Sequence, residues 1–171
     1  FQRAFAGLAE RRDGAHDDFW SWRERMYGIA SRVSPEQLHA IACQLYAELL
    51  QGGYTQVCEF HYLHHAPDGQ SYADPLTMSR ALAQAALDTG IGLTLLPTLY
   101  ERAGFNATGV GPGQQRFVAG VDRVLALRDG VRALRMPRVG AGVAIRPGGA
   151  AGPESSRRLD DAVGGDDTPN H

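Results

Sequence analysis

Residues 57–65, which read VCEFHYLHH, decide the fold of this chain. Residues 54–60, which overlap the first part of this stretch, are rich in β-branched and aromatic residues and follow a pair of glycines. This pattern predicts a buried β-strand. Turn residues follow at 66–71, APDGQS, so Tyr62 and the histidines are expected at the carboxyl end of the strand. In α/β proteins ligands bind at that end, because the loops there converge on one crevice.

The composition is that of an ordinary globular domain. The chain has 171 residues, of which 43% are hydrophobic, so it can bury a sizeable core as one domain or as part of a larger one. The formal net charge of −2 gives no electrostatic reason to expect nucleic acid or a membrane surface as a partner. All 17 basic residues are arginine, which we interpret as a GC-rich coding bias.

The two cysteines do not suggest a metal or redox site. Cys43 falls on a predicted helix and Cys58 on the predicted strand, and their spacing matches neither kind of motif, so we expect reduced thiols in the core. No apolar run approaches the roughly 20 residues that span a bilayer, and no signal peptide is visible. We therefore expect a cytoplasmic protein. Because Phe1 is not a methionine, we also expect that the true amino terminus is missing.

Helices and strands alternate along the chain. Ser34 as N-cap and Pro35 at the first helical position mark the clearest helix start. The alternation implies a parallel sheet with right-handed crossovers. Since a closed barrel takes about eight strands, we predict an α/β fold that is part of a larger α/β barrel. The predicted helices are 1–12, 17–29, 34–52, 74–90 and 114–134, and the other predicted strands are 91–97 and 139–145.

The carboxyl-terminal segment has a different composition. From Arg146 to His171 there is no aromatic residue, and Gly, Pro, Ser, Asp and Arg dominate. Such a composition does not offset the entropy cost of ordering the chain. We therefore divide the chain into a partial barrel, 1–137, and a segment, 138–171, with a weak strand followed by a disordered tail.

Three clustered histidines, His61, His64 and His65, lie close to Glu59 and suggest a metal site. On a strand, Glu59 and His61 would point to one face while Phe60 and Tyr62 point to the other. The run lacks both the His-x-His spacing of strands and the i, i+4 spacing of helices that bring imidazoles onto one ion. The spacing therefore favours histidines that belong to a loop or support neighbouring groups.

A second unusual stretch is 19–27, FWSWRERMY. It is typical of an amphipathic helix whose aromatic residues enter the core and whose arginines are solvated. Alternatively, an arginine between aromatic residues is well placed to bind a carboxylate through two hydrogen bonds. The pattern alone leaves both interpretations open.

Five stretches of the sequence carry a common signature: 1–8, FQRAFAGL; 19–27, FWSWRERMY; 59–65, EFHYLHH; 72–75, YADP; and 92–97, GLTLLP. Together they resemble the formimidoylglutamate deiminases, the histidine-degradation branch of the amidohydrolase superfamily, and the resemblance runs from Phe1 to about Leu134. It implies an incomplete metal-dependent-hydrolase (β/α)8 barrel, one zinc ion in the intact enzyme, and hydrolysis of N-formimidoyl-L-glutamate to N-formyl-L-glutamate and ammonia. It is also compatible with a homodimer.

The resemblance also implies three substrate-binding residues, Gln2, Arg23 and Tyr62. Arg23 would pair with a substrate carboxylate, and Gln2 and Tyr62 would form hydrogen bonds. In the family, a zinc-bound water becomes hydroxide near neutral pH and attacks the formimidoyl carbon.

The chain departs from the family where the zinc ligands are expected. The family's His-x-His pair would lie upstream of Phe1, and residues 143–149, VAIRPGG, stand where the family has a strand with a histidine. We therefore predict no metal ligand, no catalytic residue and no bound zinc in this chain, and no activity from it alone. The change after about residue 138 indicates either a shifted reading frame or true divergence.

Two other functions remain open. A related amidohydrolase, imidazolonepropionase-like or guanine-deaminase-like, would share the fold, but the stretch 19–27 argues against it. A non-catalytic remnant would act as an interaction module, because exposed edges of an incomplete sheet favour association.

Overall fold

The computed structural model describes residues 2–5, 19–146 and 149–164, although the side chains of residues 5, 19–24 and 112 are outside this description. None of the described helices is long and apolar enough to cross a membrane. The elements are η1 (Gln2–Phe5), α1 (Phe19–Ala30), α2 (Pro35–Gln51), β1 (Gln56–His61), α3 (Thr77–Thr89), β2 (Gly92–Leu99), η2 (Pro112–Phe117), α4 (Val121–Ala133), β3 (Val139–Ala141), β4 (Ala144–Ile145) and α5 (Pro153–Gly164).

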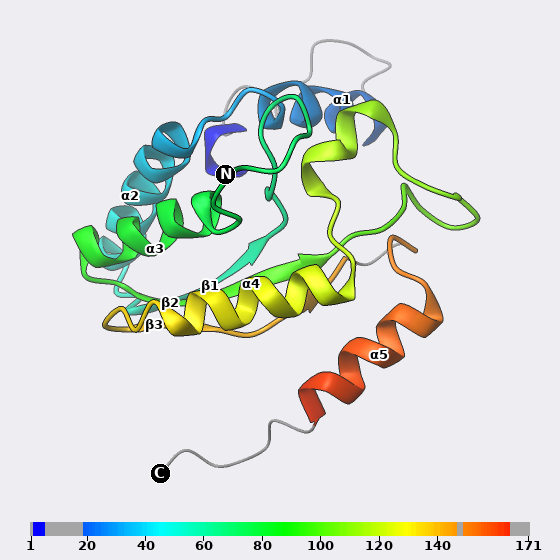
Figure 1. Ribbon diagram of the computed structural model, residues 1–171. Coiled ribbons are helices and arrows are strands. Elements are labelled where there is room, and N and C mark those ends of the chain that lie inside the picture. Colours follow the sequence, from blue (N-terminus) through cyan, green and yellow to red (C-terminus); the bar gives the residue numbers. More distant parts are fainter. Residues whose placement is uncertain (1, 6–18, 147–148, 165–171) are drawn as a thin grey trace.

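The strands form one parallel sheet in the order β1-β2-β3, and β4 extends it by pairing with the end of β2 (Figure 1). In the register, Gln56 pairs with Gly92, and Leu93 with Val139. Sheet order follows chain order, as in a (β/α) barrel. In the described part of the chain β1 pairs only with β2, so the sheet stays open, and the predicted incomplete barrel is confirmed.

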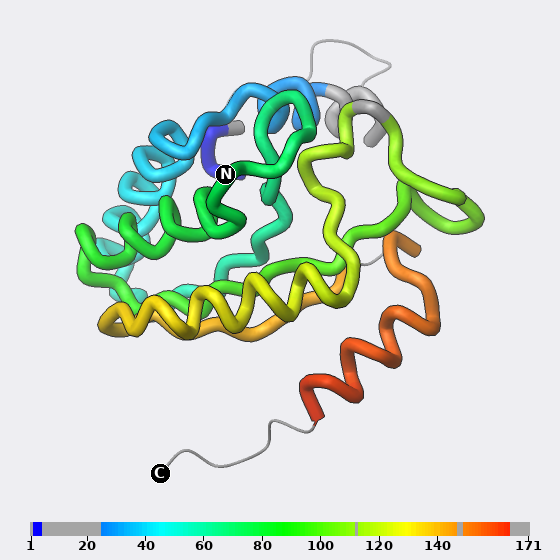
Figure 2. Tube along the Cα trace, viewed as in Figure 1, coloured from blue at the N-terminus to red at the C-terminus, as the bar shows by residue number. Residues whose placement is uncertain are grey.

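Helix α2 begins as the sequence predicts. The Ser34 hydroxyl accepts a hydrogen bond from the Gln37 backbone N–H at 3.2 Å, and the Gln37 side chain accepts one from the Ser34 N–H at 3.0 Å. This capping box satisfies two N–H groups that the helix itself cannot. Helix α2 ends with Gly52 as its C-cap. The helix packs beside α3 (Figures 1 and 2).

Helix α3 begins slightly later than predicted, at Thr77 instead of Asp74. The Asp74 carboxylate accepts a hydrogen bond from the Leu76 N–H at 2.9 Å, which closes a turn before the helix. Local hydrogen bonds from an Asp side chain compete with helical ones in this way. The helix ends as predicted at Gly90, whose φ of 82° is left-handed.

The single helix predicted over 114–134 is wrong. The structure has the short 3-10 helix η2 and then α4, because Tyr100 and Ala119 exchange two backbone hydrogen bonds of 3.0 Å between them. This bridge to the end of β2 holds the chain extended, and α4 starts only after Gly120. A tertiary contact thus overrides the helical pattern.

Burial also differs from the prediction for β1. Strand β2 is fully covered on the face that carries Leu93 and Leu95, whereas Thr94 and Leu96 on the other face are half-buried, so the prediction that both faces are covered is right only in part. Strand β1 is covered only in part: Gln56 and Cys58 on one face are exposed, whereas Val57 and Glu59 on the other face are half-buried and His61 is buried. The prediction that both cysteines lie in the core is wrong, since Cys58 is exposed and Cys43 is half-buried.

The carboxyl-terminal segment is more ordered than predicted. Residues 153–164 form α5, and Leu159 is 1% exposed where it packs with Leu99 and Val124. The Ser155 hydroxyl also donates a hydrogen bond to Glu101 at 3.0 Å. The prediction of a disordered tail is therefore wrong for α5, because contacts with β2 and α4 supply stability that local composition does not reveal. Residues 165–171 lie outside the described part, and the division at residue 137 stays a prediction.

Candidate functional site

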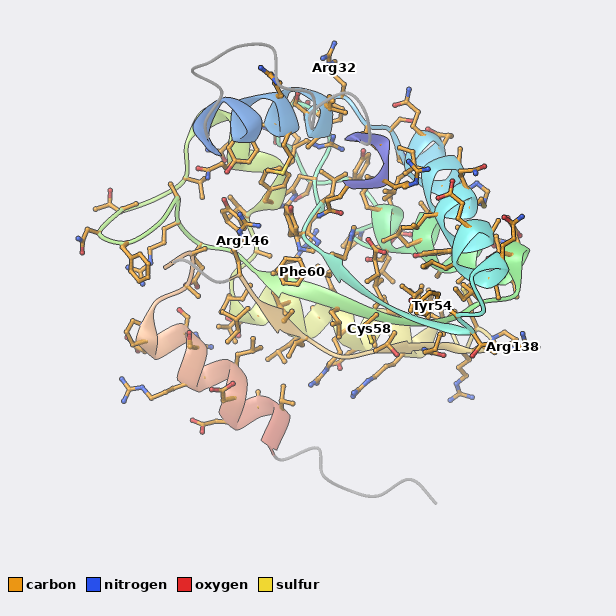
Figure 3. The ribbon with its side chains drawn as sticks, turned by 180° about the vertical axis from the view of Figure 1, so that it is seen from behind. Arg32, Tyr54, Cys58, Phe60, Arg138 and Arg146 are labelled. Atoms are coloured by element: carbon orange, nitrogen blue, oxygen red, sulfur yellow. The ribbon has the colours of Figure 1, made fainter. Side chains whose placement is uncertain are left out.

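The carboxyl ends of the strands bring polar and aromatic side chains to one edge of the sheet. His61 ends β1 opposite Pro97 of β2, so Tyr62 follows one strand at the edge where Tyr100 follows the other. Arg146 follows β4 at the same edge. Figure 3 shows Arg146 and Phe60 at this end of the sheet, whereas Tyr54 and Arg138 lie at the opposite end.

Aromatic rings form the wall of this edge. The Tyr62 and Tyr100 rings are stacked with centroids 6.3 Å apart, and Phe117 of η2 meets Tyr62 edge-on at 5.1 Å. Tyr27 of α1 packs on Phe117 at 5.6 Å. Phe60 lies 5.4 Å from Tyr62, which agrees with the prediction that these two residues share a face of β1. Segments far apart in the sequence thus build one rigid surface.

Two of the three predicted substrate-binding residues meet here. The Gln2 side-chain amide donates a hydrogen bond to the Tyr62 hydroxyl at 3.2 Å, although 60 positions separate them. Gln2 is exposed, whereas Tyr62 is buried. Arg23 belongs to α1, but its side chain lies outside the described residues.

Arg146 brings a positive charge to the same aromatic wall. Its guanidinium carbon lies 5.3 Å from the centre of the Tyr62 ring and 5.6 Å from that of Tyr100. Burial raises the pKa of Tyr62, and the Arg146 charge and the Gln2 hydrogen bond oppose this shift. From the sequence, residue 146 was predicted only to be part of a departure from the family pattern. Its place directly after a strand was the signal for a site residue.

Gln114 connects the hydroxyl groups of the wall. Its amide donates hydrogen bonds to the hydroxyls of Tyr100 at 2.7 Å and Tyr27 at 2.9 Å, while its oxygen accepts one from the Gly111 N–H at 2.8 Å. Burial, reinforced by Tyr27, raises the pKa of Tyr100. From the sequence, Gln114 was predicted only to begin a helix, and no local signal identifies it as a residue of the site.

Arg116 fastens the loop after β1 to the neighbouring elements. Its side chain donates to the backbone oxygens of His65, Ala30 and Val33, and its own carbonyl accepts from the N–H groups of His64 and His65. The arginine is 3% exposed, and burial lowers its pKa. Five hydrogen bonds at one residue therefore fix the position of the loop that carries Tyr62.

His61 and His64 are buried behind this wall as neutral rings. Their centroids lie 5.1 Å apart and their planes are almost perpendicular. Both are 2% exposed, and neither Nε2 has a hydrogen-bond partner. Burial lowers the pKa of His61 well below its usual value and, with His65, lowers that of His64 to about 3, partly offset by the Thr98 backbone. Burial likewise raises the pKa of Glu59, which lies against Tyr46 of α2.

His65 has a different role from its neighbours. It is half-buried, and its Nε2 lies 2.8 Å from the Val118 carbonyl oxygen while its Nδ1 lies 3.3 Å from the Ser71 hydroxyl. These contacts tie the loop after β1 to η2 and to the turn at residues 66–71.

The described residues at this edge do not fit a zinc centre by themselves. Among all described residues, one group of three potential ligands has its donor atoms close together, and it lies between α2 and α3 instead. The clustered histidines do not form such a group.

Comparison with known proteins assigns the fold to a class. The chain superposes on an amidohydrolase from Brucella melitensis with a TM-score of 0.89 and 41% identity, over 96% of this chain and 37% of that one. It also superposes on the atrazine chlorohydrolase TrzN from Arthrobacter aurescens TC1, determined with zinc, with a TM-score of 0.63 and 21% identity, over 86% and 34% of the two chains. No family model matches the chain. The chain thus has the fold of an amidohydrolase.

Within this class the sequence points to one enzyme. The chain is 54% identical to the formimidoylglutamate deiminase of Pseudomonas aeruginosa over 133 residues, which are 78% of this chain and 29% of that protein. The predicted resemblance to formimidoylglutamate deiminases is therefore confirmed, and the chain spans less than a third of the relative's length. The structural match over 96% of the chain also takes in most of the segment after Ile145.

Proposed function

We propose that this chain forms part of the substrate site of a formimidoylglutamate deiminase, which hydrolyses N-formimidoyl-L-glutamate to N-formyl-L-glutamate and ammonia in histidine degradation. The observation that carries the proposal is the hydrogen bond between Gln2 and Tyr62 at the carboxyl edge of the sheet. The identity with the Pseudomonas enzyme supports the choice of substrate.

The residues at the edge suit a small substrate with two carboxylates. Arg23 would bind one carboxylate through two charge-assisted hydrogen bonds. Gln2 and Tyr62 would supply neutral hydrogen bonds, which orient the substrate without changing its charge. Arg146 adds a cation beside Tyr62, and the buried aromatic wall excludes water from that side. Exclusion of water strengthens each of these polar contacts.

Other properties of the intact enzyme belong to the same proposal. We expect a complete (β/α)8 barrel in the cytoplasm, one catalytic zinc ion held by residues outside this chain, and a homodimer. The zinc-bound relative from Arthrobacter supports the choice of metal. We expect no hydrolysis by the 171-residue chain alone, because the described residues at the edge do not provide a zinc site.

Charge reversal at Arg23 tests the carboxylate contact. In an enzyme of the relatives' length that carries this segment, Arg23→Glu should raise KM for N-formimidoyl-L-glutamate by about 10- to 150-fold, since a hydrogen bond to a charged group contributes about 1.5–3 kcal/mol. The matched control is Arg32→Glu, because Arg32 is exposed and points away from the sheet (Figure 3). Ammonia release measures both. Equal KM values for the two variants would refute the assignment.

Loss of the Tyr62 hydroxyl tests the hydrogen bond. Tyr62→Phe keeps the ring contacts with Tyr100 and Phe117 but removes the acceptor for Gln2. We expect a KM increase of about 2- to 12-fold, from about 0.5–1.5 kcal/mol for a neutral hydrogen bond. Guanine should not be hydrolysed by the unmodified enzyme. Release of ammonia from guanine but not from N-formimidoyl-L-glutamate would support the alternative amidohydrolase.

A further inference from the structure

A second group of polar side chains lies between α2 and α3, on elements that do not carry the edge described above. His39 and Cys43 are four residues apart on α2 and therefore share one face of the helix. Asp88, near the end of α3, faces them. Figures 1 and 2 both show α2 and α3 side by side.

The distances within this group are close to those of a metal site. The Cys43 Sγ lies 3.5 Å from the His39 Nε2, and this nitrogen lies 2.8 Å from the Asp88 Oδ2; all three donor atoms lie within 4.8 Å of one another. Around a tetrahedral zinc, bonds of about 2.0–2.3 Å place ligand atoms roughly 3.3–3.6 Å apart. The Cys43–His39 pair already has this spacing, and the His39–Asp88 pair needs to open by only about 0.5 Å.

We propose that His39, Cys43 and Asp88 bind a zinc ion that joins α2 to α3. An imidazole nitrogen, a thiolate sulfur and a carboxylate oxygen are the three donor types that zinc takes in proteins, whereas magnesium and calcium prefer oxygen ligands alone. The fourth position falls to water. A surface groove of about 510 Å³, lined in part by His39, Glu36 and Gln84, brings solvent to the His39 side of the group, and Asp88 is itself exposed.

The side chain next to Asp88 holds its carboxylate in position to bind zinc. The Gln84 side-chain amide donates to the Asp88 Oδ1 at 2.7 Å, which leaves Oδ2 directed at His39. Partners of this kind orient metal ligands, and their loss weakens metal binding by about 10- to 100-fold.

Zinc binding moves a proton on the His39 ring and removes one from the Cys43 thiol. Without metal, the His39 Nε2–H donates to Asp88, whereas zinc needs the lone pair of that nitrogen and thus the tautomer with the proton on Nδ1. The Cys43 thiol releases its proton, since the thiolate is the ligand. The zinc ion takes the place of the His39–Asp88 hydrogen bond and binds all three donors.

Cobalt titration of the purified 171-residue chain tests the proposal, because thiolate-bound Co²⁺ has a charge-transfer band in the near ultraviolet. One equivalent of Co²⁺ should produce the band, and Zn²⁺ should remove it. Cys43→Ser should abolish the band, whereas Cys58→Ser, which alters the only other cysteine of the sequence, should keep it. No band in the unmodified chain, or loss of the band in Cys58→Ser alone, overturns the proposal.

Two further variants leave the thiol in place. Asp88→Asn should weaken zinc binding at least about 100-fold, since loss of an orienting partner alone costs about 10- to 100-fold. Gln84→Ala should weaken it about 10- to 100-fold. Both positions are exposed, so folding is retained, and circular dichroism verifies it. Unchanged zinc affinity in Asp88→Asn overturns the proposal, and zinc then binds elsewhere on the chain. Neither outcome bears on the proposed deiminase activity.

Discussion

Acidification from pH 7 to pH 5 should destabilise the fold through its two buried histidines. His61 and His64 are 2% exposed, their pKa values are lowered, and the fold holds both rings neutral. In the unfolded chain the same rings take up protons near the ordinary histidine pKa of about 6.5. Because the unfolded state then binds more protons than the fold, the free energy of unfolding decreases as the pH falls below about 6.5.

The magnitude follows from the pKa of His64, which is about 3 in the fold. With about 6.5 in the unfolded chain, this histidine alone should lower the free energy of unfolding by about 2 kcal/mol between pH 7 and pH 5. His61 acts in the same direction. Glu59 acts in the opposite direction, because burial raises its pKa and its stabilising effect is lost as the pH rises. A variant is therefore needed to isolate the histidine.

Urea unfolding followed by circular dichroism at pH 7, 6 and 5 measures the effect. His64→Phe removes the titrating group and, apart from the interaction of the His64 ring with the Thr98 backbone, removes no polar contact. It should reduce the stability difference between pH 7 and pH 5 by about 2 kcal/mol. Leu63→Ala is the control, because Leu63 is equally buried and its loss should destabilise the fold similarly at each pH. The same pH dependence in His64→Phe and the unmodified chain would refute the reasoning.

Three further predictions concern the helices. Ser34→Ala should lower the free energy of unfolding by about 1 kcal/mol in urea, since the N-cap of α2 is lost, and an unchanged value would mean that the capping box is not stabilising. Gly90→Ala should lower the free energy of unfolding by about 1–2 kcal/mol in the same assay, because a φ of 82° is strained for alanine. The added methyl group meets no close atom, so an unchanged free energy of unfolding would contradict the strain argument. Leu159→Ala should weaken the packing of α5 on β2 and α4 by about 2–5 kcal/mol and make α5 accessible to trypsin. Val163→Ala is the control, because Val163 is exposed and its truncation should not increase cleavage. Equal cleavage of both variants would show that Leu159 does not anchor the helix.

Local sequence signals predicted the elements whose stabilising contacts are local. Ser34, Pro35 and Gln37 mark the start of α2 within a few residues, and a nearly continuous apolar run marks β2. The order of helices and strands was enough to predict a parallel sheet, since a helix between two strands carries the chain back to the end where the first strand began. The stretch 57–65 likewise placed Tyr62 at the carboxyl end of a strand.

The predictions that failed depended on partners distant in the sequence. The helix expected over 114–134 is interrupted because Ala119 pairs with Tyr100, and α5 is ordered because Leu159 packs on residues of β2 and α4. Cys58 is exposed because it shares with Gln56 a face of β1 that no other part of the described chain covers there. The residues next to these positions in the sequence carry no pattern that predicts these contacts.

The sequence by itself determined the family resemblance, the parallel α/β order and two residues, Gln2 and Tyr62, that prove to be hydrogen-bonded. Only the tertiary structure decided that Arg146 lies against Tyr62, that Gln114 bonds to Tyr100, and that His61 and His64 are buried as neutral rings. The physical reason is that periodicity and capping report contacts between residues a few positions apart. A site at the ends of parallel strands is instead built from loops that meet only when the sheet has formed.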